Sequence, residues 1–337
     1  MSERQRLHVL FIVALAHAST YPQDAALDPI DAAIELAINL DERRALEDLL
    51  YLRGSINRAL LAAPDAVDDL EDCLDLLDVH SLARAPTPAQ VKFRLDATLH
   101  LAGTKFLLGD HEMAARLLDQ AENLVTRAPD SVTQKAILSW TRALLLRWRG
   151  ELEVALTTAM IAAETLRVHG HPGNASRAQT LVADIALDLT ERLNHVECPD
   201  AAREFLTLGE AYVQRALDLA QQGDVASSEA MARVTQARWE RLSHGASHEG
   251  LLHELSAIGH SHRDVALEAL AFAELGADFE ARGDLESAIH WYKRALAILN
   301  ESKMTALGVW ARRALWRLSG EMSSAQDTAG SGPRSAR

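Results

Sequence analysis

The stretch from Ala269 to Asn300 constrains the fold of this chain more than any other part of its sequence. It reads as two amphipathic helices broken at Arg282-Gly283-Asp284, where the glycine can end one helix and the aspartate can cap the next. Large and small residues recur at helical spacing. They are Phe272, Leu275, Gly276 and Phe279 on the first helix, and Ala288, Tyr292 and Ala295 on the second. Small residues suit places where two backbones approach closely, so the stretch predicts a packed, antiparallel helix pair.

This pattern resembles the tetratricopeptide repeat, whose first helix carries W-x2-L-G-x2-Y and whose second carries spaced alanines and an aromatic residue. Phe272 stands in the place of the Trp and Phe279 in that of the Tyr, while the closing Pro of the repeat is absent. Weaker copies precede it: Leu99, Ala102, Gly103 and Phe106 before the turn Gly109-Asp110, Trp140, Ala143 and Leu144 before Gly150-Glu151, and a partial copy at Leu50, Gly54, Ala66, Leu70 and Cys73. The resemblance implies a stack of helix hairpins.

The register of the repeat stays open between residues 169 and 264. Phe205, Leu208, Gly209 and Tyr212 carry the first-helix signature, yet counting helices from either side places them on a second helix. The longer repeat spacing is similar to that of the helical sensor arms of many bacterial regulators.

The predicted fold class is therefore all-α, an α-solenoid of about seven antiparallel helix hairpins plus a C-terminal capping helix near 302–318. Residues 1–319 are predicted to form a single tetratricopeptide-like solenoid. Residues 320–337, with Gly330, Gly332 and Pro333, are expected to be a disordered tail. Such a stack is held together by burial between neighbouring hairpins, because isolated helices of this length are unstable in water.

The net charge of −14 disfavours direct binding to nucleic acid or to an anionic membrane, since both depend on clustered Lys and Arg. An acidic run from Asp65 to Asp78 contains no Lys or Arg. It is interpreted as a solvated helix face, with a docking surface for a basic partner as the alternative. Cys73 and Cys198 lie far apart and predict neither a disulfide nor a cysteine zinc site, and Cys73 is expected to be a buried free thiol.

The N-terminal segment supports two interpretations. The apolar run Leu7 to Leu15, preceded by Arg4 and Arg6, suits either a first helix near 3–19 or a signal peptide over residues 1–18. The first interpretation predicts a cytoplasmic protein and the second an exported one. The run is too short to span a bilayer.

No catalytic motif occurs in the sequence. Strings of the GxxxxGK[ST], GxGxxG, GxSxG and HExxH types are absent, so we expect neither an enzyme nor a cofactor. Five histidines gather late in the chain: His244, His248, His253, His260 and His262. Imidazole suits zinc, but no Cys, Asp or Glu completes a known ligand spacing, so no metal site is predicted.

Candidate binding residues follow from the resemblance, which implies a groove lined by the first helices of the hairpins. These positions hold Tyr51, Ser55, Arg58, His100, Thr104, Thr141, Trp148 and Arg149. The other tryptophans considered are expected to fill gaps between helices: Trp140, Trp239, Trp291, Trp310 and Trp316. Aromatic, hydroxyl and cationic side chains together suit a peptide or a small anionic ligand. The sequence thus predicts a non-enzymatic scaffold that binds a protein or peptide, or alternatively a ligand-sensing regulatory module.

Overall fold

The computed structural model describes the chain except for residues 19–22, 60–61, 84–85, 129, 224 and 331–337. Over the described residues it is all-α, with no strand. The α-helices are α1 (Glu3–Ala18), α2 (Leu27–Asn39), α3 (Arg43–Ala59), α4 (Ala63–Ala83), α5 (Pro88–Leu107), α6 (His111–Val125), α7 (Val132–Arg149), α8 (Leu152–His169), α9 (Pro172–His195), α10 (Pro199–Gln222), α11 (Ala226–His244), α12 (Glu249–Ser261), α13 (Val265–Ala281), α14 (Leu285–Glu301) and α15 (Val309–Gly330). Two 3-10 helices, η1 (Gln23–Ala26) and η2 (Thr305–Gly308), precede α2 and α15.

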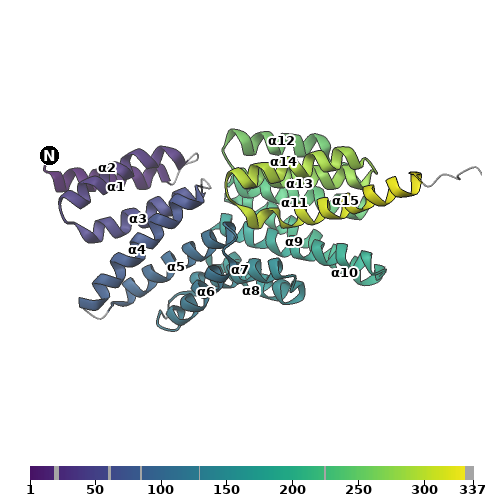
Figure 1. Cartoon of the computed structure of the whole chain (residues 1–337). Coiled ribbons are helices and arrows are strands. Elements are labelled where there is room, and N and C mark those ends of the chain that lie inside the picture. The colour runs from purple at the N-terminus through teal and green to yellow at the C-terminus, as the bar shows by residue number, and fades with distance from the viewer. Residues whose placement is uncertain (19–22, 60–61, 84–85, 129, 224, 331–337) are drawn as a thin grey trace, which may run out of the picture.

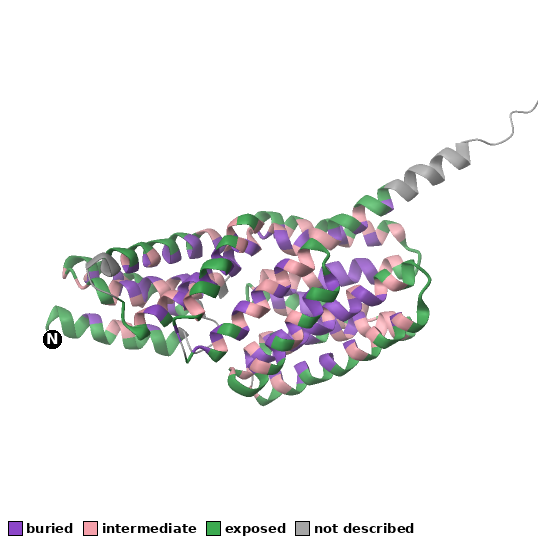
Figure 2. Cartoon of the chain, turned by 90° about the horizontal axis from the view of Figure 1, so that it is seen from below, coloured by how far each residue is buried: buried purple, intermediate pink, exposed green. Residues whose placement is uncertain are grey.

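Consecutive helices pack as antiparallel hairpins, from α1 with α2 to α13 with α14, and α15 follows the last hairpin (Figure 1). Each odd-numbered helix from α3 to α11 also contacts the next odd-numbered helix, whereas among the described residues the even-numbered α-helices make their main helix contacts with odd-numbered ones. The odd-numbered helices therefore form a continuous inner layer, and Figure 2 shows buried residues running through the adjoining hairpins. The predicted α-solenoid is confirmed.

The best-matched hairpin is built as its sequence predicts. Gly283 has φ +80°, which permits the turn, and the Asp284 carboxylate accepts a hydrogen bond from the backbone N–H of Ser287 at 3.1 Å. Gly276 lies directly against the ring of Tyr292, so that a Cβ at residue 276 would be only 2.7 Å from that ring. The Tyr292 hydroxyl donates to Glu280 at 2.8 Å.

The structure settles the register between residues 169 and 264. Helices α9 and α10 form one hairpin and α11 and α12 the next, so the signature Phe205–Tyr212 lies on a second helix. Gly209 serves the same packing purpose there, because its Cα faces Leu187 of α9, whose side chain would be 3.0 Å from an added Cβ.

The acidic run on α4 is only partly solvated. Asp69 is 5% exposed and receives hydrogen bonds from Arg53 at 2.6 Å and from Asn57 at 3.0 Å. Two further members of the run pair with α5, Glu71 with Lys105 and Asp78 with Arg94. The interpretation of this run as a solvated face is therefore wrong for Asp69, which is buried, whereas Glu71 and Asp78 are exposed and pair with α5 at the surface. Arg53 stands where the repeat usually has Leu. It joins α3 to α4 through its ion pair with Asp69.

The N-terminal end has the expected first helix, α1, whereas the C-terminal end differs from expectation. Helix α1 buries Leu7 and Ala14 against the first hairpins, and the described residues contain no helix capable of spanning a membrane. Helix α15 continues to Gly330, so part of the segment predicted as a tail is helical, and residues 331–337 lie outside the described part. Trp316 on α15 is 83% exposed, so it fills no gap between helices, contrary to the prediction.

A contact between distant parts of the chain closes the superhelix on itself. Leu107 at the end of α5 packs against Met304, Leu299 and Ala269. The Thr305 hydroxyl donates a hydrogen bond to the carbonyl of Leu108 at 3.2 Å, across 197 positions in sequence. We call this contact between the end of α5 and η2 the seam.

Candidate functional site

The inner layer carries a polar cluster on α3 and α5, which we call the His100 cluster: Tyr51, Ser55, Arg58 and His100. The His100 ring lies between two hydroxyl groups. Its Nε2 is 3.4 Å from the Tyr51 hydroxyl and its Nδ1 is 3.3 Å from the Ser55 hydroxyl. These four candidate residues, predicted from helix position alone, are brought together by the packing of α3 on α5.

The environment keeps His100 neutral. Burial lowers the pKa of His100 to about 3, and the positive charge of Arg58 adds to this effect. Burial also raises the pKa of Tyr51 to about 12, so its hydroxyl stays protonated. The cluster therefore presents neutral hydrogen-bonding groups beside one cation.

Arg58 supplies that cation, and no carboxylate of the described residues pairs with it. Its Nε is buried without a hydrogen-bond partner in the described structure. The guanidinium lies against Gly103 of α5, where a Cβ would be 3.0 Å from Nη2. Burial lowers the pKa of Arg58 to about 10, with a further contribution from the charge of Arg177. Arg58 still carries its charge at pH 7, in a place that offers no anion.

Arg177 is a residue that sequence reasoning missed. It lies on α9, and its Nη2 donates to the Ser227 hydroxyl at 3.1 Å. Because its charge acts on Arg58, the superhelix brings the guanidinium of α9 toward that of α3. No sequence spacing signals this proximity, since the two residues belong to hairpins that are not neighbours along the chain.

Two of the predicted groove residues are satisfied within their own helices. The Thr104 hydroxyl donates to the His100 carbonyl at 2.9 Å, and the Thr141 hydroxyl to that of Ile137 at 3.0 Å. Thr104 is fully buried and Thr141 is 5% exposed. Buried and hydrogen-bonded within their own helices, these two threonines serve the packing of the inner layer.

The remaining candidates, Trp148 and Arg149, lie away from the other six. They line a hollow of about 590 Å³ beside the seam, together with residues of the α5–α6 turn and of α15. The Trp148 ring lies against His111, with ring centroids 3.6 Å apart and an interplanar angle of 32°. The structure thus divides the predicted groove residues between two places.

A buried ion network, also missed from the sequence, crosses the inner layer from α7 to α13. Arg147 donates to Asp188 at 2.7 Å, and Arg238 donates to Asp188 and Glu191 at 2.8 Å each. Arg241 reaches Glu274 at 3.2 Å. The pairs Asp184/Asp188 and Arg238/Arg241 stand at helical spacing in the sequence, but the pairing between helices needs the fold.

Two buried carboxylates of this network, Asp188 and Glu274, have pKa values shifted in opposite directions. Burial would raise the pKa of Asp188, but Arg147 and Arg238 hold it below its ordinary value. Burial raises the pKa of Glu274 despite Arg241 and Arg238 beside it. The network sets three arginines against four carboxylates and joins four inner helices, so we interpret it as structural.

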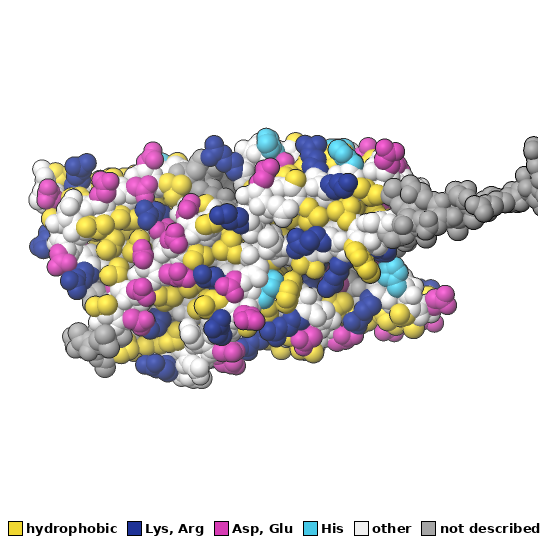
Figure 3. All heavy atoms as spheres, in the orientation of Figure 1, with side chains coloured by type: hydrophobic (Ala, Val, Ile, Leu, Met, Phe, Trp, Pro, Cys, Tyr) yellow, Lys and Arg dark blue, Asp and Glu magenta, His cyan; other side chains and the backbone are white. Residues whose placement is uncertain are grey.

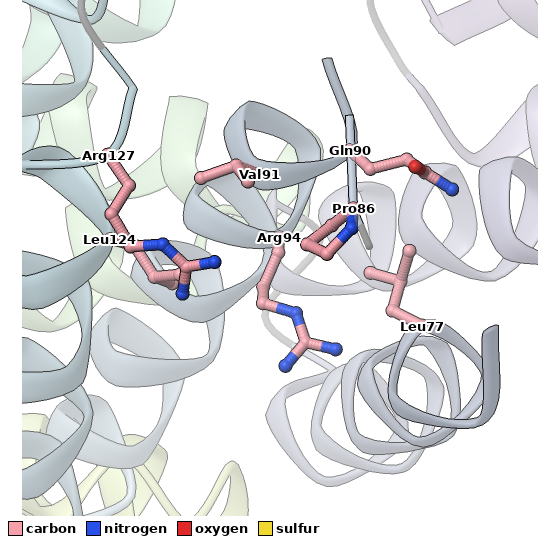
Figure 4. A pocket seen from close by; sticks show the side chains of 7 residues that line it. All are labelled: Leu77, Pro86, Gln90, Val91, Arg94, Leu124 and Arg127. Carbon is pink, nitrogen blue, oxygen red and sulfur yellow. The ribbon is translucent and has the colours of Figure 1, made fainter. Parts of the chain in front are cut away.

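A second hollow, of about 280 Å³, lies between the ends of α4 and α6 and the start of α5 (Figure 4). Its lining mixes Leu77, Val91 and Leu124 with Arg94 and Arg127. Arg94 already pairs with Asp78 at 2.5 Å.

The five late histidines do not form a metal site in the described part of the chain. No group of three His, Cys, Asp or Glu side chains is placed there to hold a metal ion, and His248 instead lies 2.6 Å from Glu240.

The neutral state of His100 predicts a pH dependence of stability. The unfolded chain protonates this histidine below pH 6.5, whereas the folded chain resists protonation until about pH 3. Stability from this residue is therefore complete above pH 6.5 and is lost as the pH falls. We expect the unfolding free energy of the wild type to fall more steeply than that of His100→Gln between pH 6.5 and 4.5, as measured by urea unfolding. Parallel curves for the two proteins would contradict a buried, neutral His100.

Comparison with known proteins places the fold. No protein-family model matches the chain, and no curated protein matches it in sequence. Among solved structures, a Rap protein complexed with Competence and Sporulation Factor is similar with a TM-score of 0.69 and 15% identity, over 90% of this chain and 78% of that one. The apo form of RapI is similar with a TM-score of 0.61 and 10% identity, over 92% of this chain and 99% of that one.

The chain has a tetratricopeptide-like helical repeat fold. The likeness extends over nearly the whole chain, so the seven hairpins and α15 form one architecture comparable to that of the Rap proteins. At these identities the likeness concerns the fold, and the binding chemistry must come from the residues of this chain.

Proposed function

We propose that this chain is a non-enzymatic scaffold that binds a protein or peptide along its inner layer, with the His100 cluster as the anchoring site. The observation that carries the proposal is Arg58, a cation held in the inner layer with no carboxylate partner among the described residues. Keeping an unpaired charge there costs stability, and an anionic group on a ligand would offset that cost.

The surrounding groups specify what the ligand offers. The charge of Arg177 on α9 acts on Arg58 as well, so both guanidinium groups favour an anion in this region. Neutral His100, Tyr51 and Ser55 supply further hydrogen bonds beside it. A peptide with an Asp or Glu side chain, or with its terminal carboxylate, fits this arrangement. A solved Rap protein of the same fold holds Competence and Sporulation Factor, which supports a binding role for such a solenoid.

The experiment uses a phage-displayed library of random peptides, panned on the whole chain. The selected sequences are remade as synthetic peptides, and their Kd is measured by fluorescence polarisation. We expect acidic peptides to be enriched and Arg58→Gln to weaken them at least about tenfold, because a hydrogen bond to a charged group contributes about 1.5–3 kcal/mol. Arg203→Gln, an exposed change of the same charge on α10, should leave Kd unchanged. Selected peptides that bind wild type and Arg58→Gln equally would count against the site.

The alternative is a ligand-sensing regulatory module, and the seam is the observation that favours it. Helix α9 belongs to the part of the chain between α5 and η2, whose two ends meet at the seam. A ligand that draws α9 toward α3 would therefore change the strain on the contact between Thr305 and Leu108. Hydrogen exchange of residues 304–308 should then change when a selected peptide binds. An unchanged exchange rate there favours the plain scaffold.

A cytoplasmic location belongs to the same proposal. Both cysteines are free thiols, Cys73 buried and Cys198 exposed, which suits a reducing compartment.

A further inference from the structure

The hollow beside the seam is lined by two parts of the chain that the seam brings together. Its volume of about 590 Å³ falls in the range of small-molecule sites. Gly109 and His111 at the α5–α6 turn and Trp148 and Arg149 at the end of α7 form one side. Thr305 of η2 and the first turns of α15 form the other. A ligand seated there would touch both sides of the seam.

The charge of this hollow opposes that of the whole chain. Arg149, Arg312 and Arg313 line it, and its lining contains no Asp or Glu, although the chain carries a net charge of −14. Over the described residues none of these three arginines forms an ion pair with a carboxylate, and Arg312 donates only to the carbonyl of Thr305. On the face of the molecule that Figure 3 shows, acidic and basic side chains are interspersed. Unpaired guanidinium groups around one hollow attract an anion with several acceptor oxygens.

An aromatic pair adjoins these cations. The ring centroids of Trp148 and His111 are 3.6 Å apart in a tilted arrangement, and His111 Nδ1 is buried without a hydrogen-bond partner in the described structure. Flat rings next to guanidinium groups suit a ligand that joins a planar ring to an anionic group. A carboxylate needs only one guanidinium, whereas the several oxygens of a phosphate chain can engage three.

We infer that this hollow binds a small phosphate-bearing ligand with a planar ring, that is, a nucleotide. The arginines hold the phosphates and the Trp148–His111 pair contacts the base. This site is separate from the His100 cluster, and its occupant would bridge the α5–α7 side and the η2–α15 side of the seam. A ligand that binds only the closed superhelix stabilises it by RT ln(1 + [L]/Kd), where [L] is the free ligand concentration.

The test is isothermal titration calorimetry of the full chain with ATP, pyrophosphate and adenosine at low ionic strength. We expect ATP to bind, with adenosine at least tenfold weaker because it lacks the phosphates, and pyrophosphate several-fold weaker because it lacks the ring. The double variant Arg149→Ala/Arg313→Ala should weaken ATP at least tenfold. Both side chains are exposed, so the variant should melt at the wild-type temperature without ligand.

Controls separate this site from general charge. Arg203→Ala/Arg263→Ala removes the same charge from α10 and from the α12–α13 turn and should leave the affinity for ATP unchanged. Trp148→Leu should bring ATP close to pyrophosphate in affinity while retaining pyrophosphate binding. Absence of ATP binding to the wild type, or an equal loss in both double variants, would overturn the assignment. Pyrophosphate binding as tightly as ATP would overturn the role of the aromatic pair.

Discussion

Replacing Arg238 with methionine is expected to lower the free energy of unfolding by about 3–5 kcal/mol. The guanidinium of Arg238 is 10% exposed and contacts Asp188, Glu191 and Glu274, which come from α9 and α13. Without it, carboxylates that folding has removed from water lose a large share of their compensating charge. A methionine fills much of the volume, so the loss reports on charge rather than on a cavity.

Urea unfolding followed by circular dichroism measures this effect. Arg233→Met is the matched control, because Arg233 lies on the same helix and pairs with Glu229 at an exposed position. Such surface pairs contribute about 0–1 kcal/mol, so the control should remain close to the wild type. Equal stability of the two variants would show that the ion network contributes little to holding α9, α11 and α13 together.

The second large effect is expected for Gly276→Leu, which should cost about 1–3 kcal/mol by overpacking. A Cβ at residue 276 would be 2.7 Å from the ring of Tyr292, which is itself only 1% exposed. The ring cannot turn aside freely, because its hydroxyl is bonded to Glu280 at 2.8 Å. The helices α13 and α14 would have to separate.

Thermal unfolding compares this variant with Gly250→Leu. Gly250 lies in the first turn of α12, where an added Cβ would meet no atom within 4 Å beyond its chain neighbours and the adjacent backbone of its own helix. That variant should match or slightly exceed the wild-type stability, because leucine is a better helix former than glycine. If Gly276→Leu melts with the wild type as well, the close contact between α13 and α14 is not a determinant of stability.

Local features of the fold could be predicted from the sequence because their causes lie within one hairpin. The Gly283-Asp284 turn and the Gly276–Tyr292 contact depend on residues that are near in sequence, and both occur as expected. The signature at Phe205–Tyr212 was ambiguous for a physical reason. Gly209 allows close approach to Leu187 whichever member of the hairpin carries it, so the pattern alone does not identify first helices.

Features that depend on the superhelix could not be predicted. The proximity of Arg177 to Arg58 and the contact of Thr305 with Leu108 are set by how the rotation between hairpins accumulates, and no local pattern encodes that rotation. The candidate site shows the same limit. Helix packing brings Tyr51, Ser55, Arg58 and His100 together, whereas Trp148 and Arg149 line the hollow beside the seam. The binding role of these residues stays a prediction.

The seam changes how such a molecule comes apart. In an open array each terminal unit frays independently, because its energy depends on a single neighbour. Here Leu107 is sheltered by Met304 and Leu299, so melting of the last hairpin also exposes apolar surface near the middle of the chain. The end of α5 and the last hairpin therefore unfold together, and the array opens cooperatively as a closed loop instead of fraying from its end.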